Sequence, residues 1–143
     1  MLKRSRRRRA LLALTILALG LGVAACGDDD DAASAESVTV TLAELTDSGQ
    51  SGTATLSASG SQTDVSIDLP GGAEGVEQPI HIHQDTCAEL DPAPVFPLSN
   101  VADGVSETTI DVALEELVGG EFSINGHKSA EEAAIYVVCG EIS

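Results

Sequence analysis

The fold is decided by residues 54–69, which read ATLSASGSQTDVSIDL. On both sides of Ser59-Gly60-Ser61 apolar residues alternate with polar ones, and a cluster of small residues of this kind is typical of a turn. A period of two places successive side chains on opposite faces of a β-strand. The stretch therefore predicts two strands with a turn between them, each with one buried and one exposed face.

The same alternation recurs along most of the chain after residue 36. Further alternating runs cover residues 38–42, 80–83, 108–114 and 122–125, and a mostly apolar run follows at 135–142. About seven short strands with turn residues between them predict an all-β domain, an antiparallel sandwich or barrel. Two segments break the pattern: a long loop at residues 84–105 that contains three prolines, and a Ser-x-x-Glu segment at 129–134, for which we expect one helical turn.

The first 25 residues resemble a secretory signal. Residues 1–9 are strongly basic, residues 10–25 are apolar, and Val23-Ala24-Ala25-Cys26 resembles a bacterial lipobox, in which the cysteine is lipidated. We therefore expect a lipoprotein signal peptide at 1–25, an acidic flexible tether at 26–36 and one β domain at 37–143. The protein is then exported and held on the extracytoplasmic face of the cell membrane by a lipid on Cys26; the alternative is an uncleaved anchor with an incidental cysteine.

The charge of the chain excludes some partners. Six of its seven basic residues precede Cys26 and all 23 acidic residues follow it, so the processed chain has one cation, Lys128, against 23 carboxylates, a difference of −22. Nucleic acid is not an expected partner, because phosphate binding needs clustered Lys and Arg. The acidity favours solubility, and an acidic binding patch is the alternative.

The other two cysteines are natural partners for each other. Once Cys26 is assigned to the signal, Cys87 and Cys139 remain, and an exported location permits a disulfide between them. The alternative is two buried free thiols.

All three histidines of the chain lie just before these two cysteines, His81 and His83 before the first and His127 before the second. If Ile80 and Ile82 face the core, alternation places both neighbouring histidines on the outward face. An unbroken strand from residue 122 places His127 on the same face, within reach of solvent. Three imidazoles suit Cu(II) or Zn(II); the alternative is that they are ordinary polar residues.

These motifs resemble the copper/zinc superoxide dismutase superfamily, including the related CHRD-domain proteins. The resemblance spans roughly residues 38–142. It is carried by the His-x-His strand with a cysteine shortly after it, by the late histidine followed by an acidic turn, and by the C-terminal run at 138–142, VCGEI.

The resemblance implies an eight-stranded Greek-key β-barrel with copper bound by His81, His83 and His127. It also implies that Glu131 orients a ligand imidazole from behind, and that Cys87 and Cys139 form the family disulfide.

Two departures from the family pattern limit what can be carried over. The loop at residues 84–105 contains no histidine, so we expect no separate zinc site, and zinc could only occupy the copper position. Tyr136 stands where the family enzymes have an arginine that guides superoxide. Lys128, next to His127, could supply local attraction for that anion, and its alternative role is that of a solvated turn residue.

The sequence therefore predicts a lipid-anchored copper-binding domain that could act as a copper-only superoxide dismutase. The alternative is a non-catalytic CHRD-type domain that binds a partner at the surface or stores metal.

Overall fold

The computed structural model describes residues 36–90 and 92–143. The expected signal peptide, Cys26 and the expected tether up to residue 35 lie outside the described residues.

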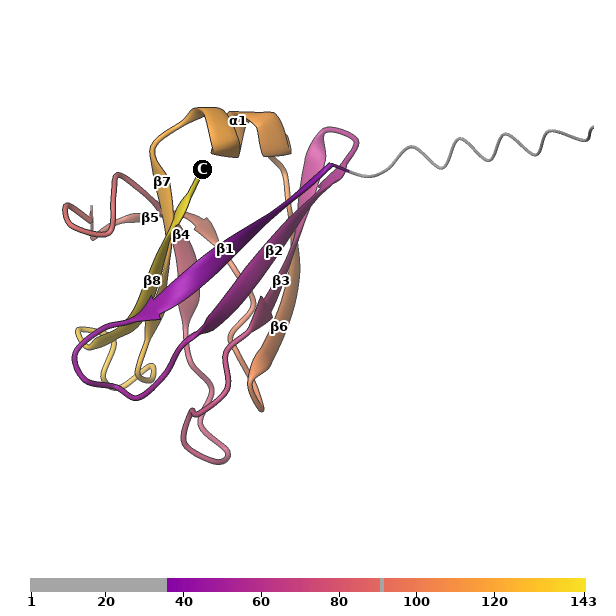
Figure 1. Ribbon diagram of the computed structural model, residues 1–143. Coiled ribbons are helices and arrows are strands. Elements are labelled where there is room, and N and C mark those ends of the chain that lie inside the picture. The colour runs from indigo at the N-terminus through magenta and orange to yellow at the C-terminus, as the bar shows by residue number, and fades with distance from the viewer. Residues whose placement is uncertain (1–35, 91) are drawn as a thin grey trace, which may run out of the picture. The chain divides into compact units, whose positions relative to one another are not determined.

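Eight strands and one short helix make up the described domain (Figure 1). In chain order they are β1 (Ser37–Glu44), β2 (Gly52–Ser59), β3 (Gln62–Asp68), β4 (Ile80–Gln84), β5 (Pro94–Pro97), β6 (Val105–Ile110), α1 (Leu114–Gly119), β7 (Phe122–His127) and β8 (Tyr136–Ile142).

All the strands belong to one antiparallel sheet, which curls into a nearly closed barrel. The strand order is β5-β4-β7-β8-β1-β2-β3-β6, and the two halves are joined where β1 pairs with β8. β7 returns to pair with β4 and not with β6, which is a Greek-key connection. Near the gap between the end strands, the Ser99 backbone N–H donates to Thr108 Oγ1 (2.8 Å), and Ser106 Oγ donates to the Ser99 carbonyl (2.7 Å). The predicted all-β barrel is confirmed.

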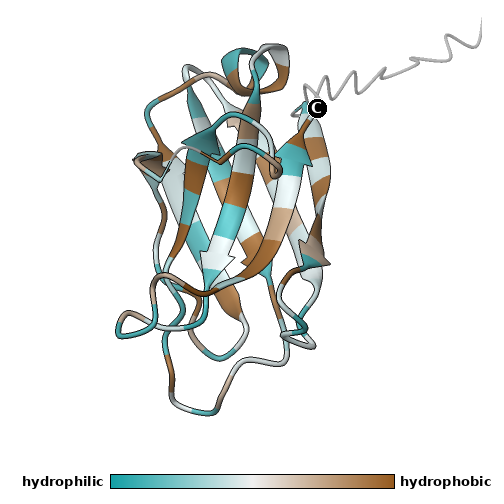
Figure 2. Ribbon diagram, turned by 90° about the vertical axis from the view of Figure 1, so that its left-hand side faces the viewer, coloured by the Kyte–Doolittle hydropathy of each residue, from teal (hydrophilic) through white to brown (hydrophobic). Residues whose placement is uncertain are grey.

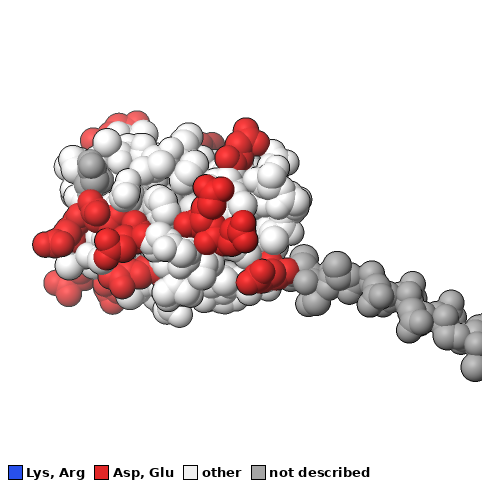
Figure 3. Space-filling model, turned by 90° about the horizontal axis from the view of Figure 1, so that it is seen from above, with Lys and Arg blue, Asp and Glu red and all other residues white. Residues whose placement is uncertain are grey.

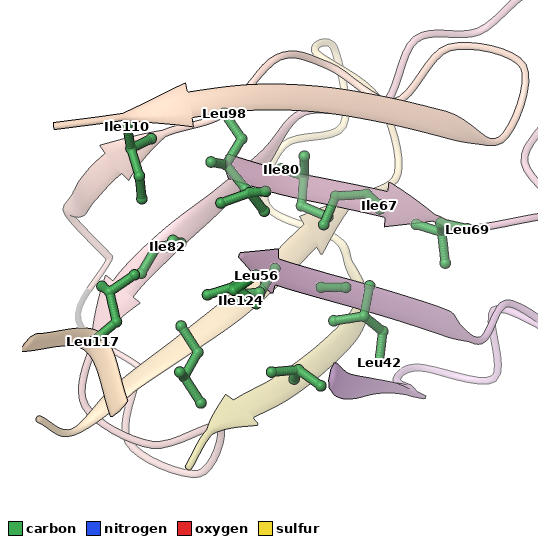
Figure 4. Packing of buried hydrophobic residues seen from close by; sticks show 14 of the residues in the cluster. Leu42, Leu56, Ile67, Leu69, Ile80, Ile82, Leu98, Ile110, Leu117 and Ile124 are labelled. Atoms are coloured by element: carbon green, nitrogen blue, oxygen red, sulfur yellow. The ribbon is translucent and has the colours of Figure 1, made fainter. Parts of the chain in front are cut away.

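Alternation along the strands builds the core, as the bands of hydropathy in Figure 2 show. In the hairpin predicted from residues 54–69, Leu56 pairs with Val65 across β2 and β3, and both side chains are buried. Figure 4 shows aliphatic side chains from both halves of the sheet meeting inside the barrel. The largest fully buried ones are Leu42, Leu56, Ile67, Leu69, Ile80, Ile82, Leu117 and Ile124. Leu, Ile and Val thus supply most of the core in a chain with few aromatic residues.

One expected strand was partly wrong. The run at residues 108–114 was predicted as a single strand, but β6 ends at Ile110, and Leu114 begins helix α1. The helix buries Leu114 and Leu117, three positions apart on one face, and lies across an end of the barrel (Figure 1). Leu114 continues the alternation of Ile110 and Val112, and it also begins the helical spacing of Leu114 and Leu117, so the short pattern did not distinguish a strand from a helix.

The segment at 129–134 forms a turn rather than a full helix. Its expected capping contact is present, because the Glu132 backbone N–H donates to Ser129 Oγ (3.1 Å). The described residues include no helix with the length and apolar character needed to span a bilayer.

Candidate metal centre

Strand β4 places two histidines on the outward face of the barrel. Ile80 and Ile82 are fully buried in the core, so the alternate residues His81 and His83 point to the other side of the sheet. The predicted orientation of this strand is confirmed.

The third histidine comes from the end of β7. The register of β7 against β8 shifts between Gly126 and His127. The His127 backbone N–H donates to the Pro79 carbonyl (2.8 Å), which holds this residue beside the start of β4. The strand is therefore not unbroken, as the prediction for His127 assumed, and the imidazole still joins the other two.

The three imidazoles form one compact cluster. Their potential ligand atoms all lie within 4.8 Å of one another. His81 Nδ1 and His127 Nε2 are 3.2 Å apart. Two nitrogens on one metal, each at about 2.0–2.1 Å, are separated by roughly 3.3 Å in tetrahedral geometry, so this pair already has a suitable spacing. In residues 36–90 and 92–143, this is the single group of three or more metal-ligating side chains close enough to hold one ion.

A backbone carbonyl determines which nitrogen His127 offers. His127 Nδ1 lies 2.5 Å from the Ala133 carbonyl oxygen, which can only accept, so Nδ1 carries the proton and donates. In the neutral ring the lone pair is then on Nε2, the atom that faces His81. An imidazole held from behind in this way is typical of metal-ligating histidines.

Burial favours the neutral form of two of the rings. Desolvation lowers the pKa of His81 below its usual value, and the neighbouring charges of His127 and His83 lower it further. Desolvation also lowers the pKa of His127; His83 adds to this effect, while the hydrogen bond to Ala133 opposes it. Metal binding requires unprotonated imidazoles, so these lowered pKa values favour it at neutral pH.

The cluster is less open than the sequence suggested. All three histidines were expected within reach of solvent, but His83 is 1% and His127 6% exposed, while His81 is half-buried. The segment after β4 returns over this face, because Cys87 is bonded to Cys139 on β8 with their Cα atoms 5.9 Å apart. The predicted disulfide is thus confirmed, and the long-range contacts that bury these histidines are ones that parity alone does not contain.

Tyr136 covers another side of the cluster. It pairs with His127 across β7 and β8, and the two ring centroids are 4.9 Å apart. The residue noted in the sequence for standing where the family enzymes have an arginine therefore contacts a candidate ligand directly.

The two charged residues singled out in the sequence lie in the turn after β7. Lys128 Nζ forms an exposed ion pair with Glu132 Oε1 (2.9 Å). Glu131 is exposed, and the group in contact with His127 Nδ1 is the Ala133 carbonyl. Both Lys128 and Glu131 line a surface hollow of about 560 Å³ between this turn and the β1–β2 and β3–β4 loops.

Sequence reasoning missed three residues at the site: Ala133, Ser123 and Asn125. The last two alternate with Ile124 on β7, so parity could have placed them on the histidine face. The contact of Ala133 is made by its backbone, for which the residue type gives no signal.

No protein-family model matches the chain, and no curated protein matches it. Its function is therefore inferred from the histidine cluster itself.

Proposed function

We propose that the protein binds one copper ion through His81, His83 and His127. The observation that carries this proposal is the convergence of three imidazoles whose ligand atoms lie within 4.8 Å of one another. An all-imidazole donor set suits copper or zinc, and among residues 36–90 and 92–143 no carboxylate or thiolate belongs to the cluster. The resemblance to the superoxide dismutase superfamily favours copper, and zinc is the competing occupant of the same position.

Each histidine of such a site has different neighbours. The Ala133 carbonyl holds the tautomer of His127, Tyr136 packs on the same ring, and His83 is buried. His81, the most exposed of the three, marks the side from which a small ligand would enter. Bound copper would supply one-electron chemistry: it would accept an electron from one superoxide, which leaves as dioxygen, and return it to a second superoxide, which takes two protons from solvent and leaves as hydrogen peroxide.

A second candidate is a domain that binds or stores copper without catalysis, and the charge distribution favours it. Superoxide is an anion, and several groups of carboxylates lie on the face shown in Figure 3, where the described residues in view contribute no Lys or Arg. Lys128, the cation nearest the cluster in sequence, is already paired with Glu132. Electrostatic attraction of superoxide to the site is therefore weak.

Tyrosine fluorescence provides a direct test of metal binding. Tyr136 is the single tyrosine of a chain without tryptophan, so intrinsic emission reports one ring 4.9 Å from His127. Stoichiometric Cu(II) should quench this emission, and the copper should give a nitrogen-rich electron paramagnetic resonance signal. His81→Gln should lose both effects while it stays folded, because His81 is half-buried.

Gln84→Ala is the matched control, since Gln84 is an exposed residue on the same strand. It should bind copper like the unaltered chain. The absence of stoichiometric copper in the unaltered chain would refute the proposal, and equal quenching in His81→Gln would place the metal elsewhere.

A superoxide assay then separates the two candidates. A dismutase should consume superoxide in a copper-dependent and salt-sensitive manner, and this activity should be lost in His127→Ala. A storage or binding domain should bind copper with no activity above that of the free ion.

We also propose that the protein is exported and anchored by a lipid on Cys26. In a bacterial host, Cys26→Ser should abolish incorporation of labelled fatty acid and release the domain from the membrane fraction. Unchanged labelling in this variant would refute the proposal.

A further inference from the structure

Two buried polar side chains lie on the same outward face as the histidines. In the ladder between β4 and β7, Ser123 is opposite His83 and Asn125 is opposite His81. Both polar residues have an exposed fraction of 0%. Directly opposite side chains have Cβ atoms about 4.5–5.5 Å apart, so these two residues lie against the histidine cluster.

Each of the two carries an oxygen without a protein partner among the described residues. Asn125 Nδ2 donates to the Val138 carbonyl (3.1 Å), and this contact orients the amide. Asn125 Oδ1 and Ser123 Oγ, however, are buried and accept or donate no hydrogen bond within residues 36–90 and 92–143. Burying a polar atom without a hydrogen bond is unfavourable. In native proteins a buried polar atom that lacks a protein partner is usually hydrogen-bonded to an ordered water.

The surroundings suit a water molecule. A buried water needs two to four polar partners, and an amide oxygen and a hydroxyl two residues apart on one strand face supply two. The loop tied down by Cys87 covers this part of the sheet, since Cys139 pairs with Asn125 across β7 and β8. A water beneath the loop would be shielded from exchange with bulk solvent.

We infer that Ser123 and Asn125 form a buried water-binding site beside the histidine cluster. The water donates one hydrogen bond to Asn125 Oδ1 and shares another with Ser123 Oγ. Where the proposed copper is bound, this water is a fixed hydrogen-bond donor next to the metal ligands, and Ser123 and Asn125 act as positioning residues. That last role rests on the proposed function, whereas the water site itself does not.

A crystal structure of the metal-free full chain is the direct test. We expect an ordered water within about 3.2 Å of both Asn125 Oδ1 and Ser123 Oγ, and we expect Ser123→Ala to lose it. The melting temperature gives a second readout. If Ser123 Oγ bonds to water, Ser123→Ala should leave the melting temperature unchanged or lower it; if the hydroxyl is simply unsatisfied, its removal should raise it.

Ser106→Ala is the matched control. Ser106 is also buried on a strand, but its hydroxyl donates to the Ser99 carbonyl (2.7 Å), so this variant should lose stability and keep the water. The inference is overturned if no water lies between the two oxygens, and in that case Ser123→Ala should raise the melting temperature.

Copper binding is scored separately by the fluorescence of Tyr136. A chain that holds the water but binds no copper would refute the proposed function alone. A chain that binds copper but holds no water would refute this inference alone.

Discussion

Removal of the disulfide between Cys87 and Cys139 should strongly destabilise the domain. The bond joins residues 52 positions apart, and it restricts the unfolded chain far more than the folded barrel, in which β8 already pairs on both sides. For a loop of this length the chain-entropy model gives about 4 kcal/mol at 25 °C. With a urea slope of about 2 kcal/mol per molar, the unfolding midpoint should fall by about 2 M.

The assay is urea unfolding of the Cys87→Ala/Cys139→Ala variant and of the unaltered chain with and without a reductant. Alanine is chosen because Cys139 is 3% exposed, and serine would bury a hydroxyl there. The reduced chain keeps both sulfur atoms and therefore their packing. Its decrease in the free energy of unfolding thus measures the effect of the bond alone. If the free energy of unfolding falls by less than about 1 kcal/mol in both the double-alanine variant and the reduced chain, the entropic reasoning is contradicted.

Three further predictions concern the histidines, the helix and the contact between β8 and β1. Burial lowers the pKa of His81 and His127, so the unfolded chain takes up protons at higher pH than the folded one. The metal-free protein should therefore lose stability relative to the His81→Gln/His127→Gln variant as the pH falls below about 6.5, and urea unfolding at pH 7.5 and 5.5 measures this difference. Leu117→Ala should cost about 2–5 kcal/mol in urea unfolding because the side chain is fully buried, whereas Val118→Ala, at 37% exposure, should change the free energy of unfolding by less than about 0.5 kcal/mol. Gly140→Ala should cost about 3 kcal/mol, because its Cβ would overlap a backbone carbonyl of β1; an unchanged thermal midpoint would contradict this close approach.

The sequence predicted the barrel well where one face of a strand is apolar throughout. Leu56 and Val65 illustrate this, because alternation determined both the element and the face that it buries. Helix α1 was missed because Leu114 fits a strand continued from β6 as well as a helix. The helix is favoured because it buries Leu114 and Leu117 at the end of the barrel. That burial depends on the tertiary structure and is not visible in the local pattern.

At the candidate site, parity predicted which residues gather but not how deeply they lie. His83 faces away from the core, yet its side chain is buried. Ser123 and Asn125 were passed over for the same reason, since a polar residue on an outward face is ordinarily solvated. The register between β4 and β7, which places them opposite the histidines, is a long-range property that the local pattern does not contain.

The two strands at the ends of the sheet order, β5 and β6, bear on whether copies of the protein adhere to one another. An unpaired strand edge invites strands of other chains to add to it and so favours aggregation. β5 is only four residues long and both its first and last residues, Pro94 and Pro97, lack a backbone N–H, so it makes a poor template for such addition. β6 carries Glu107, and two copies meeting edge to edge there would bring like charges together. The open seam of the barrel is thus protected against self-association by proline on one side and by charge on the other.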